Sequence, residues 1–231
     1  MQEYEIVINH RGIEMPLRKI PLAKDEIYHI YTRSIAGFKV FDDHIDYNRL
    51  IGAIKYYSLT TPPCRLSAFD DLLKLGKAPD TCNLKQLVKI IAYCVMPTHI
   101  HLVIQEIRDG GISNFMNLIL KSYGKHYNSK HGRKGPLWEG PFKNVLVKTS
   151  EQLIHLTRYV HLNPVTAFIV NKPEEWPYSS YREYIGIKAD NNICPPENRL
   201  DDMDVESYIK FVNDQIDYQR TLAVIKNLLL E

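Results

Sequence analysis

Residues 87–107 read LVKIIAYCVMPTHIHLVIQEI, and this stretch determines much of the fold. It consists of two apolar runs of strand length, which Pro97 interrupts. A proline turn between two such runs predicts an antiparallel β-hairpin. The hairpin would supply two neighbouring strands of a sheet around which the other segments are arranged.

Two histidines lie on one face of the second strand of this hairpin. Successive side chains of a strand alternate between its faces, so His99 and His101 point one way. The apolar Ile100 and Leu102 point the other way. Two imidazoles at this spacing can bind one metal ion, because neutral imidazole is a common metal ligand. The spacing alone also fits two structural or solvent-exposed histidines, so a third ligand is needed to distinguish these readings.

Predicted strands and helices alternate along the chain on either side of the hairpin. Strands are predicted at 25–34, 87–96, 98–107 and 142–148, and helices at 42–59, 110–132 and 149–163. This β-α-β-β-α-β-α order indicates an α+β fold. The expected architecture is a two-layer, ferredoxin-like domain in which helices pack on an antiparallel sheet.

The sequence also marks where helices begin and end. Asp42 or Asp43 is a suitable N-cap for the first helix. Thr149 and Gln152 have the spacing of a capping box at the start of the helix 149–163. Pro164 indicates that this helix ends or bends there, because the residue before a proline avoids helical dihedral angles.

Two segments lie outside this core. Residues 60–86 contain three prolines and a short helix-like piece, and we interpret them as an insertion. Residues 187–231 form an acidic tail with two helix-like pieces, 205–215 and 219–230. We therefore expect one domain over 1–186, followed by a short helical tail of unassigned role.

The net charge of +2 conceals an uneven distribution of charge. Residues 121–148 contain seven Lys or Arg side chains and one acid, whereas residues 187–231 contain five basic and nine acidic side chains. Aromatic residues are interleaved with the cations of the basic segment, which suits phosphate contact combined with base stacking. The segment therefore indicates nucleic acid as a partner, with a solvated charged face as the alternative.

Composition excludes several other classes of protein. Hydrophobic residues make up 45% of the 231 residues and charged residues 24%, as in a globular protein. The N-terminal residues lack the apolar region of a secretory signal, and no apolar stretch is long enough to span a membrane. The four cysteines show no C-x-x-C spacing, so we expect reduced thiols and a cytoplasmic protein.

The helix at 149–163 offers a third ligand for the histidine pair. Tyr159 and Asn163 are four residues apart and share one helical face, while His161 projects from another side. A tyrosine nucleophile with a metal-binding amide one turn away would form a compact active site. The chain has 15 tyrosines, however, and a partly buried packing role is common for this residue.

Five stretches of the chain, in the order in which they occur, resemble the HUH-type single-tyrosine transposases, in particular the REP-associated tyrosine transposases. The stretches are YHIYTRSI, AYCVMPTHIHLVI, KSYGKHYNSKHGRKGPLWEGPFK, YVHLNPV and WPYSSYREYIG, and they span about residues 20–186. The resemblance implies that residues 1–186 form a catalytic domain. It also implies that His99, His101 and Asn163 bind the metal and that Tyr159 is the nucleophile.

The resemblance further implies the cofactor, the substrate and the reaction. These are Mg²⁺ or Mn²⁺, single-stranded hairpin-forming DNA, and cleavage through a 5′-phosphotyrosine intermediate. A DNA partner would place the protein with the nucleoid. Relatives include dimers that exchange the tyrosine helix and monomers, so the choice between a monomer and a homodimer stays open.

Within the basic segment, specific side chains are expected to contact DNA. We predict phosphate contacts from Lys121, Lys125, Arg133, Lys134 and Lys143. Trp138 would either stack on a base or anchor its loop to the core.

Two departures from the family leave alternatives to the transposase reading: Pro141, and the tail beyond residue 186, which matches no part of the family. Pro141 stands in WEGPFK where the family often has arginine, so a phosphate contact is lost or Lys143 supplies it. A hairpin-binding regulator that does not cleave, and a metal phosphodiesterase that uses water, are therefore alternative functions. Tyr123 and Tyr127 are rival nucleophiles, which we interpret instead as DNA-facing or packing residues.

Overall fold

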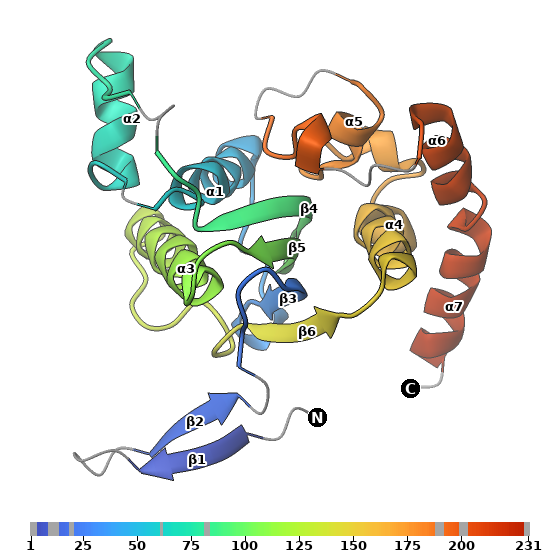
Figure 1. Ribbon diagram of the computed structural model, residues 1–231, viewed down its shortest axis with the longest axis horizontal. Coiled ribbons are helices and arrows are strands. Elements are labelled where there is room, and N and C mark those ends of the chain that lie inside the picture. The colour runs from blue at the N-terminus through green and yellow to red at the C-terminus, as the bar shows by residue number, and fades with distance from the viewer. Residues whose placement is uncertain are drawn as a thin grey trace.

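A four-stranded antiparallel sheet forms the centre of the protein (Figure 1). The structure, a computed structural model, describes residues 4–8, 14–18, 21–60, 62–80, 84–187, 192–198 and 203–228. The sheet order is β4 (Val88–Met96), β5 (His99–Glu106), β3 (Ile27–Arg33) and β6 (Lys143–Val147). This is the ferredoxin-like strand order, and it confirms the expected fold.

The predicted hairpin at Pro97 is present. Strands β4 and β5 are antiparallel, with Met96 opposite His99 and Val88 opposite Glu106. The register shifts between Ile90 and Ala92, where β4 contains an irregularity.

Helices cover both faces of the sheet. Helices α1 (His44–Tyr57) and α3 (Gly111–Lys130) pack on one face, as the two-layer expectation requires (Figure 1). Helix α4 (Ser150–Thr166) lies on the other face. Helices α6 (Val205–Asn213) and α7 (Ile216–Leu228) contact α4 on the side away from the sheet. The tail is therefore built onto the tyrosine-bearing helix.

The remaining elements are short and lie outside the central sheet and its main helices. Helix α2 (Leu66–Lys74) lies in the predicted insertion, and α5 (Tyr181–Tyr184) follows the 3₁₀ turn η2 (Pro173–Glu175). Two further 3₁₀ turns, η1 (Ile35–Gly37) and η3 (Pro196–Asn198), connect longer elements. Strands β1 (Tyr4–Ile8) and β2 (Glu14–Arg18) pair with each other in a separate two-stranded sheet, which the sequence analysis did not predict. Among the described helices, none has the length and apolar character needed to cross a bilayer.

Alternation along β5 fixes which face is the core. Ile100, Leu102 and Ile104 are at most 1% exposed and belong to the hydrophobic core. Full burial of such a side chain stabilises the fold by about 1.5 to 3 kcal/mol. The same alternation turns His99 and His101 toward the side of α4.

The predicted helix starts are confirmed in part, and one end differs from expectation. Asp43 caps α1 by accepting hydrogen bonds from two backbone amides. The Thr149 hydroxyl accepts from the Gln152 amide at 3.1 Å, but the Gln152 side chain accepts from Lys148 at 2.9 Å rather than from Thr149. Helix α4 continues to Thr166, past Pro164, because a proline within the last turn removes only one hydrogen bond.

Candidate active site

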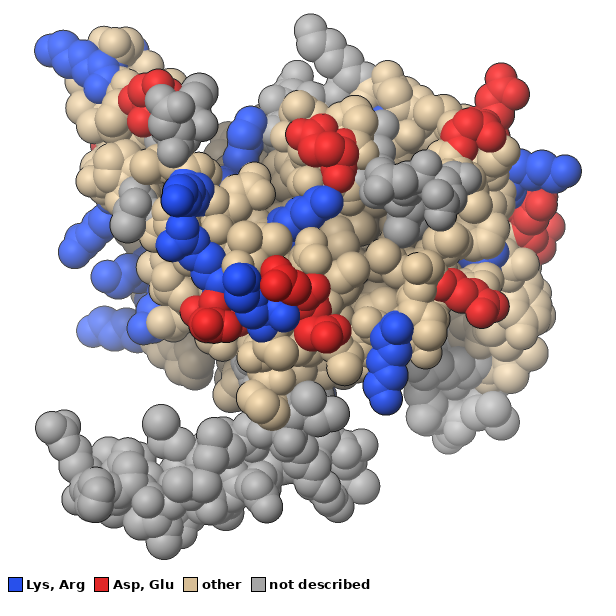
Figure 2. All heavy atoms as spheres, viewed as in Figure 1, with Lys and Arg blue, Asp and Glu red and all other residues tan. Residues whose placement is uncertain are grey.

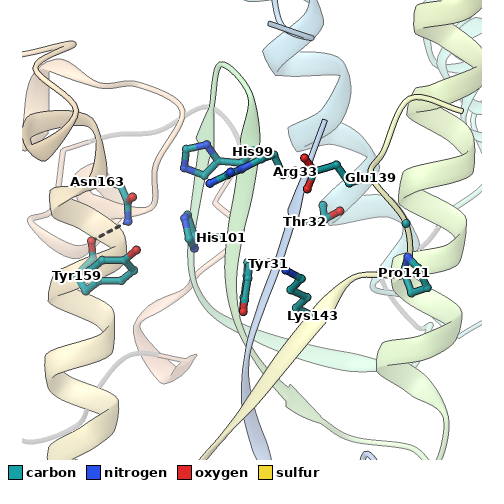
Figure 3. A pocket seen from close by; sticks show the side chains of 11 residues that line it. Tyr31, Thr32, Arg33, His99, His101, Glu139, Pro141, Lys143, Tyr159 and Asn163 are labelled. Atoms are coloured by element: carbon teal, nitrogen blue, oxygen red, sulfur yellow. Dashed lines mark hydrogen bonds between the residues drawn. The ribbon is translucent and has the colours of Figure 1, made fainter. Parts of the chain in front are cut away.

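A cleft of about 510 Å³ opens between the sheet, α4 and the loop before β6 (Figure 3). Five residues predicted to act in catalysis or DNA binding line it together, although they come from three separate elements. These are His99, His101, Lys143, Tyr159 and Asn163. The remaining wall includes the aromatic ring of Tyr31, the charged Arg33 and Glu139, and Pro141.

Each histidine of the pair is held by a hydrogen bond at its Nδ1 atom. His99 Nδ1 lies 2.9 Å from Thr98 Oγ1, and His101 Nδ1 lies 2.9 Å from His29 Nε2. Within the described part of the chain, neither His99 Nε2 nor His101 Nε2 has a hydrogen-bond partner. A hydrogen bond on one ring nitrogen orients the ring and leaves the other nitrogen available as a metal ligand.

Burial keeps both imidazoles neutral. It lowers the pKa of His99 to about 4, with a smaller contribution from the Arg33 charge. It also holds the pKa of His101 well below the usual value and lowers the pKa of His29 to about 4. Neutral imidazole is the form that binds a metal, so both histidines can act as metal ligands near pH 7.

Tyr159 faces this pair from α4. Its ring centroid is 5.6 Å from that of His101, and the two ring planes are nearly perpendicular at 87°. The side chain is 42% exposed, so a substrate can reach it. Partial burial raises the pKa of the Tyr159 phenol above its usual value, and the Asn163 side chain offsets part of this rise. The phenol is therefore neutral near pH 7 and must lose its proton during any nucleophilic attack.

Asn163 lies one turn beyond Tyr159 on the same face of α4. Its Nδ2 atom donates a hydrogen bond to the Tyr159 backbone carbonyl at 3.0 Å (Figure 3). This bond fixes the orientation of the amide and leaves Oδ1 without a partner among the described residues. Two imidazole nitrogens and one amide oxygen form a donor set that suits a divalent metal, with positions left open for water or substrate.

A second group of potential metal ligands lies outside the cleft, and a lysine already neutralises one of its carboxylates. Asp42, Asp46 and His131 come together where α1 begins and α3 ends. The Lys130 ammonium lies 2.8 and 2.9 Å from the two carboxylate oxygens of Asp46. Because a cation already occupies this carboxylate, the cleft between the sheet and α4 is the better candidate for a metal.

The other predicted DNA contacts lie outside the cleft. Lys121 and Trp138 line an adjoining groove, which shares Gly140 and Pro141 with the cleft. The Trp138 indole donates a hydrogen bond to the Leu120 carbonyl at 3.2 Å, so this side chain anchors its loop to α3.

Three further cations that were predicted to contact DNA also lie outside the cleft. Lys125 lines a groove between α1, α2 and α3 together with Arg49 and Arg65. Arg133 donates hydrogen bonds to Asn128 and to the Pro136 carbonyl, and so holds the loop after α3, while Lys134 is exposed. Figure 2 shows Lys and Arg side chains gathered on the side of the molecule where α2 and α3 lie.

The rival tyrosines are not equivalent to Tyr159. Tyr123 is fully buried, and its hydroxyl donates to the Val40 carbonyl, which makes it a packing residue. Tyr127 is half-buried and packs against His131, with ring centroids 4.2 Å apart. Neither lines the cleft that contains the histidine pair.

Sequence analysis missed the two side chains that hold the histidines. His29 lies within the predicted strand at 25–34, and Thr98 lies in the hairpin turn. Alternation along the strand could have placed His29 on the same face as Tyr31. Its proximity to His101 depends on the pairing of β3 with β5, which local sequence patterns do not specify.

The fold and this cleft define the class as a ferredoxin-like α+β domain. A histidine-lined cleft lies between one face of its sheet and the helix that carries Tyr159. Residues 53–163 match the family model described as Transposase IS200 like. This stretch is 111 of the 231 residues, and over it the chain is similar to that family.

Two known proteins are similar to parts of the chain. A Haemophilus influenzae protein, provisionally named a REP-associated tyrosine transposase, is 27% identical over 110 residues. The matched region covers 43% of this chain and 61% of that relative, which is less than two thirds of its length. A REP-associated tyrosine transposase solved with a REP hairpin has a TM-score of 0.50 and 17% identity. That match covers 77% of this chain and 90% of the other, and it shows a common fold.

Proposed function

We propose that this protein is a metal-dependent transposase that cleaves and rejoins single-stranded, hairpin-forming DNA through a 5′-phosphotyrosine at Tyr159. The observation that carries the proposal is that the exposed Tyr159 ring faces His101 at 5.6 Å across one cleft. Asn163, one helical turn away, lines the same cleft. The match of residues 53–163 to the transposase family model supports the reaction class.

His99, His101 and Asn163 would hold the divalent metal. When bound, Mg²⁺ or Mn²⁺ would neutralise charge that develops on the scissile phosphate. The two imidazoles suit Mn²⁺ better than Mg²⁺, which prefers oxygen ligands.

The chain's own residues perform the covalent step. The Tyr159 hydroxyl gives its proton to solvent, and its oxygen forms a bond to phosphorus. The bond from phosphorus to the 3′ oxygen breaks, and the 3′ oxygen takes a proton from solvent and leaves as a hydroxyl. Arg33 and Lys143 line the cleft and would contact phosphate oxygens of the strand. The phosphodiester energy stays in the tyrosine link, so the reverse attack by a 3′ hydroxyl joins two ends without another energy source.

Hairpin DNA is the proposed substrate because the relative of known structure is bound to a REP hairpin. In this chain, Lys121 lies on α3 and lines the groove that adjoins the cleft, and Lys121 and Lys125 together line the next groove. Both would contact the backbone of the hairpin. Pro141 contributes no charge, but Arg33 and Lys143 supply two cations to the cleft that it lines. These cations favour the cleaving enzyme over a regulator that only binds.

Incubation of the full chain with labelled hairpin DNA and Mn²⁺ or Mg²⁺ tests the proposal by denaturing electrophoresis. We expect a covalent protein–DNA band with the wild type and none with Tyr159→Phe, while hairpin binding by the variant stays within a few-fold of the wild type. Tyr127→Phe is the matched control and should form the band normally.

The same gel distinguishes the alternatives. Cleaved DNA without a covalent band would identify a phosphodiesterase that uses water. Binding without any cleavage would identify a regulator. A band that persists in Tyr159→Phe would reject Tyr159 as the nucleophile.

A further inference from the structure

His29 is a half-buried polar residue that the proposed reaction does not use. It lies on β3 and reaches diagonally across to His101 on the neighbouring strand β5. The two rings meet through His29 Nε2 and His101 Nδ1 at 2.9 Å. Their centroids are 5.1 Å apart and their planes differ by 17°. With 2.9 Å between the two nitrogens, the ring centroids can lie little farther apart than 5.1 Å. The contact therefore lies in the planes of both rings, which meet edge to edge.

An in-plane contact between two neutral imidazoles requires one proton between the nitrogens. In one arrangement, His29 Nε2 carries the proton and donates it to His101 Nδ1. His101 would then carry its own proton on Nε2, where that nitrogen could not bind a metal. In the other arrangement, His101 Nδ1 donates to His29 Nε2, and the lone pair of His101 Nε2 stays free.

We propose that His29 is a positioning residue that accepts the Nδ1 proton of His101 and thereby turns a free Nε2 lone pair toward the cleft. His101 lines the cleft, and its Nε2 atom has no hydrogen-bond partner in the described part of the chain. In the same way, Thr98 Oγ1 lies 2.9 Å from His99 Nδ1 and can accept the proton of that nitrogen. Both histidines are thus held at Nδ1 and are free at Nε2.

The surroundings of His29 favour a role in orientation. Its ring lies 5.2 Å from that of Tyr31 and 6.1 Å from that of Tyr159, the latter in an edge-to-face contact. These contacts fix the ring of His29 between the strand and α4. His29 does not line the cleft, so it acts on a substrate or metal only through His101.

The hydrogen-bond direction is a property of the metal-free protein, whereas its consequence for metal binding rests on the proposed function. Long-range ¹H–¹⁵N NMR of the full chain with labelled histidines measures the direction, because protonated and unprotonated ring nitrogens have different shifts. We expect the His101 signals, assigned from their loss in His101→Asn, to show a protonated Nδ1 and an unprotonated Nε2.

Two variants at position 29 form a matched pair. His29→Phe keeps an aromatic ring but removes the acceptor, whereas His29→Gln keeps an oxygen acceptor near the position of Nε2. We expect His101 to lose its preference for the Nδ1-protonated form in His29→Phe and to regain it in His29→Gln. A protonated Nε2 in the wild type, or an unchanged His101 in His29→Phe, would overturn the proposal.

Calorimetric titration with Mn²⁺ measures the consequence. We expect about 10-fold to 100-fold weaker binding in His29→Phe, the usual effect of losing a group that orients a metal ligand, and recovery in His29→Gln. Equal Mn²⁺ affinity in His29→Phe and the wild type would contradict the inference. A wild type that shows the expected His101 protonation but neither binds Mn²⁺ nor cleaves DNA would reject the proposed function and leave the hydrogen bond confirmed.

Discussion

At the scale of single residues, the candidate site depends on hydrogen bonds to side chains that would not touch the substrate. His99 is oriented by Thr98 in the hairpin turn, with 2.9 Å between His99 Nδ1 and the Thr98 hydroxyl. Removing such a partner leaves the ligand in place but lets its ring rotate and change tautomer. The hydroxyl of Thr98 should therefore matter for metal binding although it is no ligand.

Thr98→Val tests this role because valine preserves the shape and removes the hydroxyl. We expect Mn²⁺ affinity to fall by about 10-fold or more. Thr98→Ser, which retains the hydroxyl, is the control and should stay near the wild type in the same titration. Unchanged affinity in Thr98→Val would show that the hydrogen bond does not position His99.

Lys143 is the cation of the basic segment that lies inside the cleft. If it contacts one phosphate, Lys143→Gln should weaken hairpin binding and flatten the plot of log affinity against log salt by about 0.7 to 0.9. Binding measured between about 50 and 200 mM salt is the test. Lys210→Gln, on α6, removes the same charge away from the cleft and should leave the slope unchanged.

At the scale of elements, the tail positions α4. His161, on the far side of α4 from the cleft, is fully buried and lies 2.7 Å from both the Tyr208 hydroxyl and the Ser180 hydroxyl. Arg220 on α7 donates hydrogen bonds to the Val165 and Val170 carbonyls near the end of α4. These contacts fix the helix that carries Tyr159 against its own sheet.

Tyr208→Phe measures the stabilisation from this contact. The variant leaves a nitrogen of buried His161 without its partner, which should cost about 1 to 3 kcal/mol in the free energy of unfolding. Tyr218→Phe removes a hydroxyl from a side chain that is 59% exposed and should cost far less. Urea denaturation of both variants is the measurement, and equal stabilities would contradict the role of Tyr208.

Gly111 marks a close approach between elements at the start of α3. A Cβ atom there would lie 2.5 Å from the Leu87 carbonyl oxygen, so Gly111→Ala should destabilise the protein by about 1 to 3 kcal/mol. A Cβ atom on Gly52, inside α1, would meet no atom within 4 Å, and Gly52→Ala should stabilise by up to about 1 kcal/mol. Thermal unfolding should therefore shift in opposite directions in the two variants.

Most elements and their order are predictable from the sequence because their signals are local. The hairpin at Pro97, the cap at Asp43 and the helix with Tyr159 each follow from a few neighbouring residues. The contact of His29 with His101 and that of His161 with Tyr208 join residues 72 and 47 positions apart. Such contacts depend on strand pairing and helix packing, which no local pattern encodes.

At the scale of the whole molecule, buried neutral histidines link stability to pH. Burial lowers the pKa of His161 to about 3, whereas the unfolded chain should have the ordinary value near 6.5. Below pH 6.5 the unfolded state binds more protons, so stability is full above that pH and declines as the pH falls toward 3. His161 alone should lower the unfolding free energy by about 2 kcal/mol between pH 7 and 5.

Urea denaturation at pH 7 and pH 5 measures this effect in the wild type and in His161→Gln. The variant should be less stable at pH 7 but should lose less stability on acidification. Equal losses in the two proteins would show that His161 does not carry the pH dependence.

The central claim is that Tyr159 becomes covalently linked to the 5′ phosphate of a cleaved hairpin DNA. Mass spectrometry of the trapped complex, after digestion of both protein and DNA, tests this claim most directly. The predicted result is a nucleotide phosphate on Tyr159, in the peptide that also contains Asn163. A phosphate on Tyr127 or another residue, or no modified peptide when the DNA is cut, would contradict it.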